Sequence, residues 1–125
     1  MDTKNRYIKL FKEPIDITII EIKDSDRINK DIEYLNYDLN YITGFSQYKD
    51  LEVIYIGYPF GKDLAPGSGT IIEINDYEFD HDIPTEKGSS GSPIVLFDTL
   101  KVIGIHKHGH KEKKNKCWNF YSNNI

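Results

Sequence analysis

A serine held between glycines stands at residues 88–91, Gly-Ser-Ser-Gly, shortly before the apolar run at residues 94–97. Glycine on each side lets the backbone adopt conformations that are closed to other residues, so the N–H groups around Ser90 can point to one place. Converging N–H groups stabilise an oxyanion, and a hydroxyl beside them suits nucleophilic acyl transfer. The residues alone leave a second interpretation open, which is a glycine- and serine-rich hairpin loop without a chemical role.

Imidazole groups, the usual proton acceptors for such a serine, are confined to the second half of the chain. They occur at four positions: His81, His106, His108 and His110. The last three alternate, so an extended strand would place them on one face, where Asp80 or Asp82 could complete a metal site. We favour the simpler interpretation of a solvated hairpin with a lysine-rich tip at residues 111–114, and we expect no metal and no cofactor.

The composition restricts the classes of protein to which the chain can belong. Its 125 residues are 38% hydrophobic and 29% charged, which indicates one globular domain with a modest core. The net charge of −4 argues against a nucleic-acid partner. Because no signal peptide, membrane-spanning run or second cysteine is present, we expect a cytoplasmic protein without a membrane partner or an internal disulfide.

Short runs of branched and aromatic residues predict the elements that position the serine. Strands are expected over residues 6–11, 15–22, 51–58, 69–74, 92–97, 101–106 and 116–121. Residues 24–41 are interpreted as a connector, in which helical spacing allows one short helix near residues 28–35. Several short strands at close spacing predict an antiparallel sandwich or a small barrel.

Two stretches together resemble the trypsin-like serine peptidases, and the glutamyl-endopeptidase-like branch is the most similar. They are Asp-His-Asp-Ile-Pro-Thr-Glu-Lys-Gly-Ser-Ser-Gly-Ser-Pro-Ile at residues 80–94 and Val-Ile-Gly-Ile-His at residues 102–106. The resemblance extends to residues 54–59 and to Asp16, and covers most of residues 14–121. It implies an all-β fold, the C-terminal half of an antiparallel Greek-key trypsin-like barrel protein plus the strand that carries the aspartate. The corresponding domains are residues 1–45 and residues 46–125.

The resemblance also implies roles for particular residues. Ser90 would be the nucleophile, the backbone N–H groups of Gly88 and Ser90 would form the oxyanion hole, and Asp16 would orient the catalytic histidine. Thr85 and His106 would lie at the base of the substrate pocket, where a hydroxyl and an imidazole suit an acidic side chain. The alternatives are that Asp16 is an ordinary polar residue on the outer face of a strand and that His106 is a strand-end histidine facing solvent.

The chain departs from this family at the catalytic histidine. In chymotrypsin-like peptidases the triad runs in the chain order His, Asp, Ser, but no histidine precedes Asp16. His81 falls between Asp16 and Ser90 and is therefore out of order. We interpret the chain as a serine endopeptidase domain that is incomplete and inactive alone, because an unassisted hydroxyl is a weak nucleophile.

The expected partners follow from that interpretation. They are a polypeptide substrate and an N-terminal barrel or partner chain that supplies the histidine, or a second copy of the chain. The absence of the first barrel should leave an apolar patch, for which the isoleucines and tyrosines of residues 7–22 are the candidates. The alternative function is a non-catalytic, degenerate peptidase-fold module that acts in protein interaction or structure.

Overall fold

The computed structural model describes residues 3–13, 15–30, 32–75, 78–109 and 115–119. Contacts divide the chain into two units, Met1–Tyr34 and Leu35–Ile125, each of which is described by itself below. The sequence placed the domain boundary between residues 45 and 46, and that boundary stays a prediction. No helix in the described ranges is long and apolar enough to cross a membrane.

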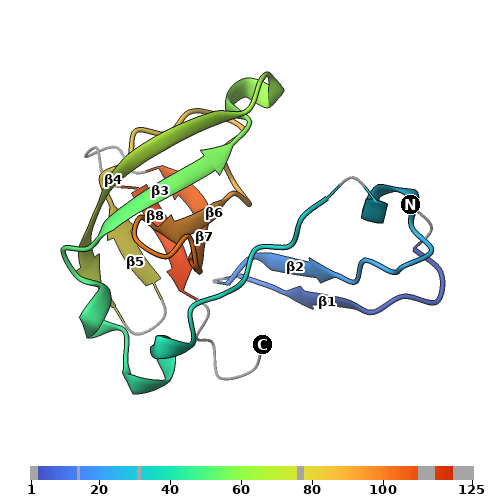
Figure 1. Ribbon diagram of the computed structural model, residues 1–125, viewed down its shortest axis with the longest axis horizontal. Helices are drawn as coiled ribbons and strands as arrows, with labels where there is room; N and C mark the ends of the chain where they lie inside the picture. Colours follow the sequence, from blue (N-terminus) through green and yellow to red (C-terminus); the bar gives the residue numbers. More distant parts are fainter. Residues whose placement is uncertain (1–2, 14, 31, 76–77, 110–114, 120–125) are drawn as a thin grey trace. The chain divides into compact units, whose positions relative to one another are not determined.

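The second unit is a closed barrel of six antiparallel strands, drawn in green to red in Figure 1. Its strands are β3 (Glu52–Gly57), β4 (Ala65–Ile74), β5 (Glu78–His81), β6 (Pro93–Leu96), β7 (Val102–Gly109) and β8 (Asn115–Asn119). They follow one another around the barrel in the order β3-β4-β5-β8-β7-β6. The all-β antiparallel barrel expected from the sequence is thereby confirmed.

The strand order explains where the serine loop lies. β3, β4 and β5 are successive neighbours, as are β6, β7 and β8, but β5 and β6 do not pair with each other. The connection between them, residues 82–92, must therefore pass from one three-stranded segment to the other. This crossover contains the Gly-Ser-Ser-Gly loop, so the loop is held at both ends by strands of the barrel.

The barrel core follows from strand alternation. Along β3 the side chains of Val53 and Tyr55 are buried, and the residues between them are more exposed. The remaining buried members of the core lie between residues 48 and 103 and are Tyr48, Ile71, Phe79, Ile83, Ile94, Leu96 and Ile103. This core positions the crossover loop from within, because Ile83 and the loop are parts of the same segment.

A short segment before the barrel is tied to its wall. The N–H of Asp38 donates to the carbonyl of Val102 at 2.9 Å, and the N–H of Val102 donates to the carbonyl of Asn36 at 2.8 Å. The buried Tyr48 hydroxyl donates to the Asp38 carboxylate, and burial together with that carboxylate raises the pKa of Tyr48. The two backbone bonds attach residues 36–38 to β7, and the Tyr48 hydroxyl holds the Asp38 side chain.

Four short 3-10 helices are the only helical elements in the described ranges. They are η1 (Arg27–Lys30), η2 (Leu39–Thr43), η3 (Ser46–Tyr48) and η4 (Pro59–Gly61). The possible helix near residues 28–35 is wrong, since one 3-10 turn ends at Lys30 and residues 32–35 have no helical structure. Ile28 and Leu35, whose spacing suggested the helix, are exposed. A helix there would bury no apolar face, and such burial is the main source of helix stability in proteins.

The first unit contains one hairpin. Strand β1 (Ile8–Phe11) pairs antiparallel with β2 (Ile17–Ile20), and Ile8 lies opposite Ile20. The predicted strand over residues 15–22 is therefore shorter than expected. Asp16 precedes β2 in a left-handed backbone conformation, with φ of 55°, which ends the extended geometry on its N-terminal side.

Candidate functional site

Two glycines shape the turn that holds Ser90. Gly88 and Gly91 have φ of 93° and 88°, values that side chains with a Cβ rarely adopt. A Cβ on Gly88 would also lie 3.2 Å from the backbone nitrogen of Phe60. Both positions therefore require glycine, as the sequence pattern suggested.

Hydrogen bonds connect this turn to the strands around it. The N–H of Gly91 donates to the carbonyl of His106 on β7 at 2.8 Å, and the N–H of Phe60 donates to the carbonyl of Lys87 at 2.6 Å. Within the turn, the N–H of Ser89 donates to the carbonyl of Glu86 at 3.1 Å. The turn is thus fixed to β7 on one side and to η4 on the other.

The N–H groups within the turn differ in their use. Those of Ser89 and Gly91 are occupied by internal acceptors. Among the described residues, those of Gly88 and Ser90 donate to no protein acceptor. These are the two N–H groups that the resemblance assigns to an oxyanion hole, and they remain available to a ligand.

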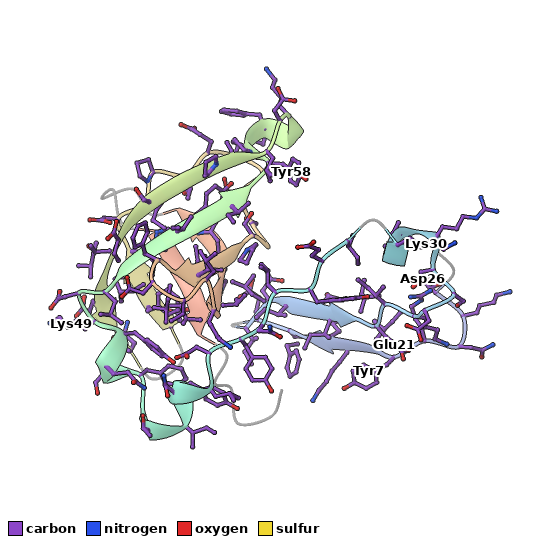
Figure 2. All side chains as sticks on the ribbon, viewed as in Figure 1. Tyr7, Glu21, Asp26, Lys30, Lys49 and Tyr58 are labelled. Atoms are coloured by element: carbon purple, nitrogen blue, oxygen red, sulfur yellow. The ribbon has the colours of Figure 1, made fainter. Side chains whose placement is uncertain are left out.

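The Ser90 side chain is exposed at an open pocket of about 300 Å³. The pocket is lined by Ile56, Gly57, Tyr58, Gly88, Ser90, Gly91, Ser92 and Pro93. Tyr58, labelled in Figure 2, follows the end of β3 and is itself 57% exposed. The Ser90 hydroxyl donates to the backbone carbonyl of Lys107 at 2.7 Å. In the described part of the chain, its partner is thus a carbonyl and not an imidazole.

Ser89 has a structural role in the turn. Ser89 is 1% exposed, and its hydroxyl oxygen accepts hydrogen bonds from the Tyr55 hydroxyl at 2.8 Å and from the Glu86 N–H at 3.2 Å. Tyr55 belongs to the barrel core. The turn beside Ser90 is therefore supported from beneath by a core tyrosine, a contact that the sequence did not reveal.

His106 is buried beside a second buried histidine. His106 is 3% exposed and His81 is 0% exposed, and the Nε2 of His81 lies 3.2 Å from the Nδ1 of His106. The interpretation of His106 as a strand-end histidine facing solvent is wrong, because β7 continues past it to Gly109 and His106 points into the barrel wall. Its partner His81 comes from β5, a strand that the sequence pattern did not predict.

The hydrogen bonds assign the protons of this pair. The N–H of Ile83 donates to Nδ1 of His81 at 3.1 Å, so that nitrogen carries no proton. The proton of His81 is then on Nε2 and is donated to Nδ1 of His106, which leaves the His106 proton on Nε2. Burial, reinforced by the neighbouring His106, lowers the pKa of His81 to about 3, so His81 is neutral at neutral pH.

The alternative of a metal site formed by His106, His108 and His110 stays untested. The register of β7 against β8 shifts between His106 and His108. His110 lies outside the described residues. Among those described, no group of three potential ligands is close enough to hold a metal ion.

Two predicted site residues stand apart from this cluster. Thr85 is half-buried and lies in the same crossover as Ser90. Asp16 is exposed and belongs to the first unit, whereas Ser90 belongs to the second. The assignments of Asp16 to the triad and of Thr85 to the pocket stay predictions.

Comparison with known proteins identifies the fold. No protein-family model and no curated protein sequence matches the chain. Solved structures match it: a Glu endopeptidase in complex with MPD has a TM-score of 0.68 and 19% identity over 86% of this chain and 50% of its own. The serine endoprotease from Yersinia pestis has a TM-score of 0.70 and 13% identity over 91% of this chain and 39% of its own.

A cysteine-to-alanine mutant of the tobacco etch virus protease is also similar. Its TM-score is 0.65, with 15% identity over 98% of this chain and 52% of its own. The chain therefore has a chymotrypsin-like protease fold and spans about half the length of the proteases that it matches. It is a peptidase-like half domain.

Proposed function

We propose that this chain is the serine-bearing half of a chymotrypsin-like serine endopeptidase. The observation that carries the proposal is the pair of N–H groups of Gly88 and Ser90, which have no acceptor within the described part of the chain and lie beside an exposed hydroxyl at an open pocket. Ser89 uses its N–H within the turn and Gly91 uses its N–H on β7, whereas Gly88 and Ser90 are exposed and can donate to a ligand. The free pair suits an oxygen that acquires negative charge during acyl transfer.

In the proposed reaction, Ser90 Oγ attacks the carbonyl carbon of a peptide bond. A histidine on the complementary half takes the hydroxyl proton, Asp16 orients that imidazole, and the two N–H groups stabilise the oxyanion. The imidazolium then gives the proton to the leaving amine, and water releases the acyl group from Ser90 by the reverse sequence. Before attack, the Ser90 hydroxyl must exchange its bond with the Lys107 carbonyl for one with the imidazole.

The chain alone should be almost inert by this mechanism. Without the histidine, the oxyanion hole and substrate binding alone account for a rate only ~10³–10⁴ times that in water. The buried histidines do not replace it, because His81 and His106 are hydrogen-bonded to each other within the barrel wall.

We also propose that the pocket prefers a substrate with an acidic side chain. The backbone of His106 accepts the Gly91 N–H, so His106 lies one hydrogen bond from the serine turn. The resemblance places His106 and Thr85 at the base of the pocket, where an imidazole and a hydroxyl suit a carboxylate. Replacing His106 by alanine should lower the preference for an acidic residue and leave the chemistry at Ser90 in place.

The second candidate function is a non-catalytic module with this fold. It is favoured by the bond between the Ser90 hydroxyl and the Lys107 carbonyl, which is a stable resting arrangement that needs no imidazole. In that case Ser90 would stay unreactive whatever polypeptide is added to the chain.

Labelling with a fluorophosphonate, which requires an activated serine, distinguishes the two functions. The chain is compared alone and in a chimera that carries upstream the portion of the Glu endopeptidase that it does not cover. We expect weak labelling of the chain alone, strong labelling of the folded chimera and none after Ser90→Ala, whereas Ser68→Ala, at an exposed serine of β4, serves as the matched control and retains labelling.

Two results would contradict the proposal. One is a folded chimera, shown by a cooperative thermal transition, that remains unlabelled. The other is strong labelling of the chain alone that disappears when His81, His106, His108 or His110 is replaced, because the base would then lie within this chain.

A further inference from the structure

The serine turn contains a four-residue turn that two different backbone geometries can close. The N–H of Ser89 donates to the carbonyl of Glu86 at 3.1 Å, and Gly88, the third residue of this turn, has φ of 93°. A positive φ at the third residue is typical of a type II turn, whereas a type I turn has a negative φ there and is closed by the same hydrogen bond. The bond from Ser89 therefore does not decide between the two geometries.

The two geometries differ in the direction of the peptide unit that joins Lys87 to Gly88. Conversion of one turn into the other rotates this unit by about half a turn, so that the Lys87 carbonyl and the Gly88 N–H exchange sides. Glycine adopts positive and negative φ about equally readily, so Gly88 does not by itself hold the observed form. The force that keeps the Gly88 N–H in its observed direction must come from outside this turn.

A hydrogen bond from η4 holds the peptide unit. The N–H of Phe60 donates to the Lys87 carbonyl at 2.6 Å. In a trans peptide unit the carbonyl and the N–H point in opposite directions, so this bond directs the Gly88 N–H away from Phe60. A type I turn would direct the Lys87 carbonyl away from Phe60 and would break the bond. The contact with η4 therefore favours the geometry in which the Gly88 N–H is available to a ligand.

Phe60 can donate this bond because its own backbone is left-handed. It lies in the connection between β3 and β4 (Figure 1), where the N–H of Gly61 donates to the carbonyl of Tyr58 at 2.9 Å. Phe60 is the third residue of this second turn and has φ of 58° and ψ of 17°. Its N–H belongs to the central peptide unit of the second turn. With a negative φ at Phe60, that peptide unit would rotate and its N–H would point away from Lys87.

Phenylalanine is an unfavourable residue for this conformation. The third position of a type II turn favours glycine or asparagine, and another residue that is held there is strained. Burial of the side chain does not compensate for the strain, because Phe60 is 59% exposed. Strained backbone of this kind occurs most often at functional sites, where the surrounding structure maintains it. The hydrogen bond to Lys87 supplies a reason for the conformation of Phe60 that its side chain does not supply.

On the basis of the proposed function, we infer that Phe60 is a positioning residue for the oxyanion hole. Its left-handed backbone presents an N–H that holds the Lys87 carbonyl, and the held peptide unit keeps the Gly88 N–H available to the oxyanion. Relaxation of Phe60 to a negative φ would allow the peptide unit to rotate. The site would then lose one of its two donors and become inactive, and the phenyl ring takes no part in this role.

Substitutions that keep the N–H of residue 60 and change its backbone preference test the inference. Phe60→Gly and Phe60→Asn favour a positive φ, whereas Phe60→Val disfavours it, because a β-branched side chain fits the left-handed region poorly. Phe97→Val is the matched control. It makes the same replacement at an exposed phenylalanine of the barrel unit that is not among the residues with positive φ.

The first measurement uses the chain alone and does not depend on catalysis. A type II turn places the Hα of Lys87 close to the amide proton of Gly88, and a type I turn separates these protons. The nuclear Overhauser effect between them therefore reports the direction of the peptide unit. This signal should be strong in the wild-type chain, in Phe60→Gly, in Phe60→Asn and in the control, and it should be largely lost in Phe60→Val.

The second measurement uses fluorophosphonate labelling of Ser90 in the chimera with the Glu endopeptidase portion. Phe60→Val should lower the maximal labelling rate about 10- to 100-fold, since complete loss of one oxyanion donor costs ~10²–10³-fold. The probe concentration that gives half the maximal rate and the pH dependence of labelling should not change, because the pocket and the base are unaltered. Phe60→Gly and Phe60→Asn should label at the wild-type rate, which loss of a ring contact would not allow.

The outcomes separate this inference from the proposed function. The inference would be overturned by a wild-type proton signal in Phe60→Val, by labelling of Phe60→Gly that is as slow as that of Phe60→Val, or by equally slow labelling of Phe97→Val. If Phe60→Val does not fold, Phe60→Ala replaces it, since alanine also disfavours a positive φ. A folded chimera that is not labelled, beside a proton signal that responds as expected in the chain alone, would refute the enzyme and retain the positioning of the Gly88 N–H by Phe60.

Discussion

Acid should destabilise the barrel through His81. This side chain is fully buried, accepts the Ile83 N–H and donates to His106, so it has no room for a second proton without losing a bond. Its pKa falls from the ordinary value of 6.5 in the unfolded chain to about 3 in the folded one. Between these values the unfolded state binds a proton that the folded state does not bind.

The sign and size of the effect follow from that difference. The contribution of His81 is fully present above pH 6.5 and is lost progressively as the pH falls toward 3. At pH 5 the unfolded imidazole is almost wholly protonated and the folded one is almost wholly neutral, which lowers the free energy of unfolding by about 2 kcal/mol relative to pH 7.5.

Urea unfolding followed by circular dichroism at pH 7.5 and pH 5 measures this change, and the variant His81→Gln provides the comparison. Glutamine can accept the Ile83 N–H but does not titrate. The variant should be less stable at pH 7.5, yet it should lose about 2 kcal/mol less than the wild-type chain on acidification, because the carboxylates common to both cancel. Equal losses in the two proteins would refute the assignment of a neutral, buried His81.

Two further predictions concern the support of the serine turn. Tyr55→Phe removes only the hydroxyl that donates to Ser89. The substitution should lower the free energy of unfolding in urea by about 1 kcal/mol and should speed amide exchange within residues 86–91. Unchanged exchange would show that this hydrogen bond does not hold the turn. Gly57→Ala places a methyl group against the Tyr55 hydroxyl and Ser92 Oγ. It should lower the free energy of unfolding by about 1–3 kcal/mol, and a melting temperature equal to that of the wild-type chain would contradict this packing.

The parts of the fold that the sequence revealed are those set by local patterns. The sequence of β3 predicts a strand. The sequence also predicts glycine at the turn around Ser90, because a positive φ is a conformation that glycine adopts without strain. The absence of a histidine before Asp16 is likewise plain from the sequence. These features led to the prediction of an all-β barrel, which the structure confirms, and to the hypothesis that the chain is one half of a peptidase.

The errors lie where pairing between strands overrides local preference. β5, Glu-Phe-Asp-His, contains three polar residues and has no strand alternation, yet β4 and β8 pair with it on both sides. β4 begins at Ala65 and includes Pro66 and Gly67, because its pairing with β3 compensates for residues that disfavour strands. In both segments, hydrogen bonds to neighbouring strands, and not the local sequence, determine that the segment is a strand.

The sequence by itself determined the all-β class of the fold, the need for glycine in the serine turn and the absence of a histidine before Asp16, because each depends on residue type and near neighbours. Only the tertiary structure decided that His106 is buried against His81, that Tyr55 supports Ser89, and that the hairpin carries an uncovered apolar face. The two histidines are 25 residues apart, and Tyr55 and Ser89 are 34 residues apart. Contacts of that separation exist only once the barrel closes, since closure brings strands together that share no local signal.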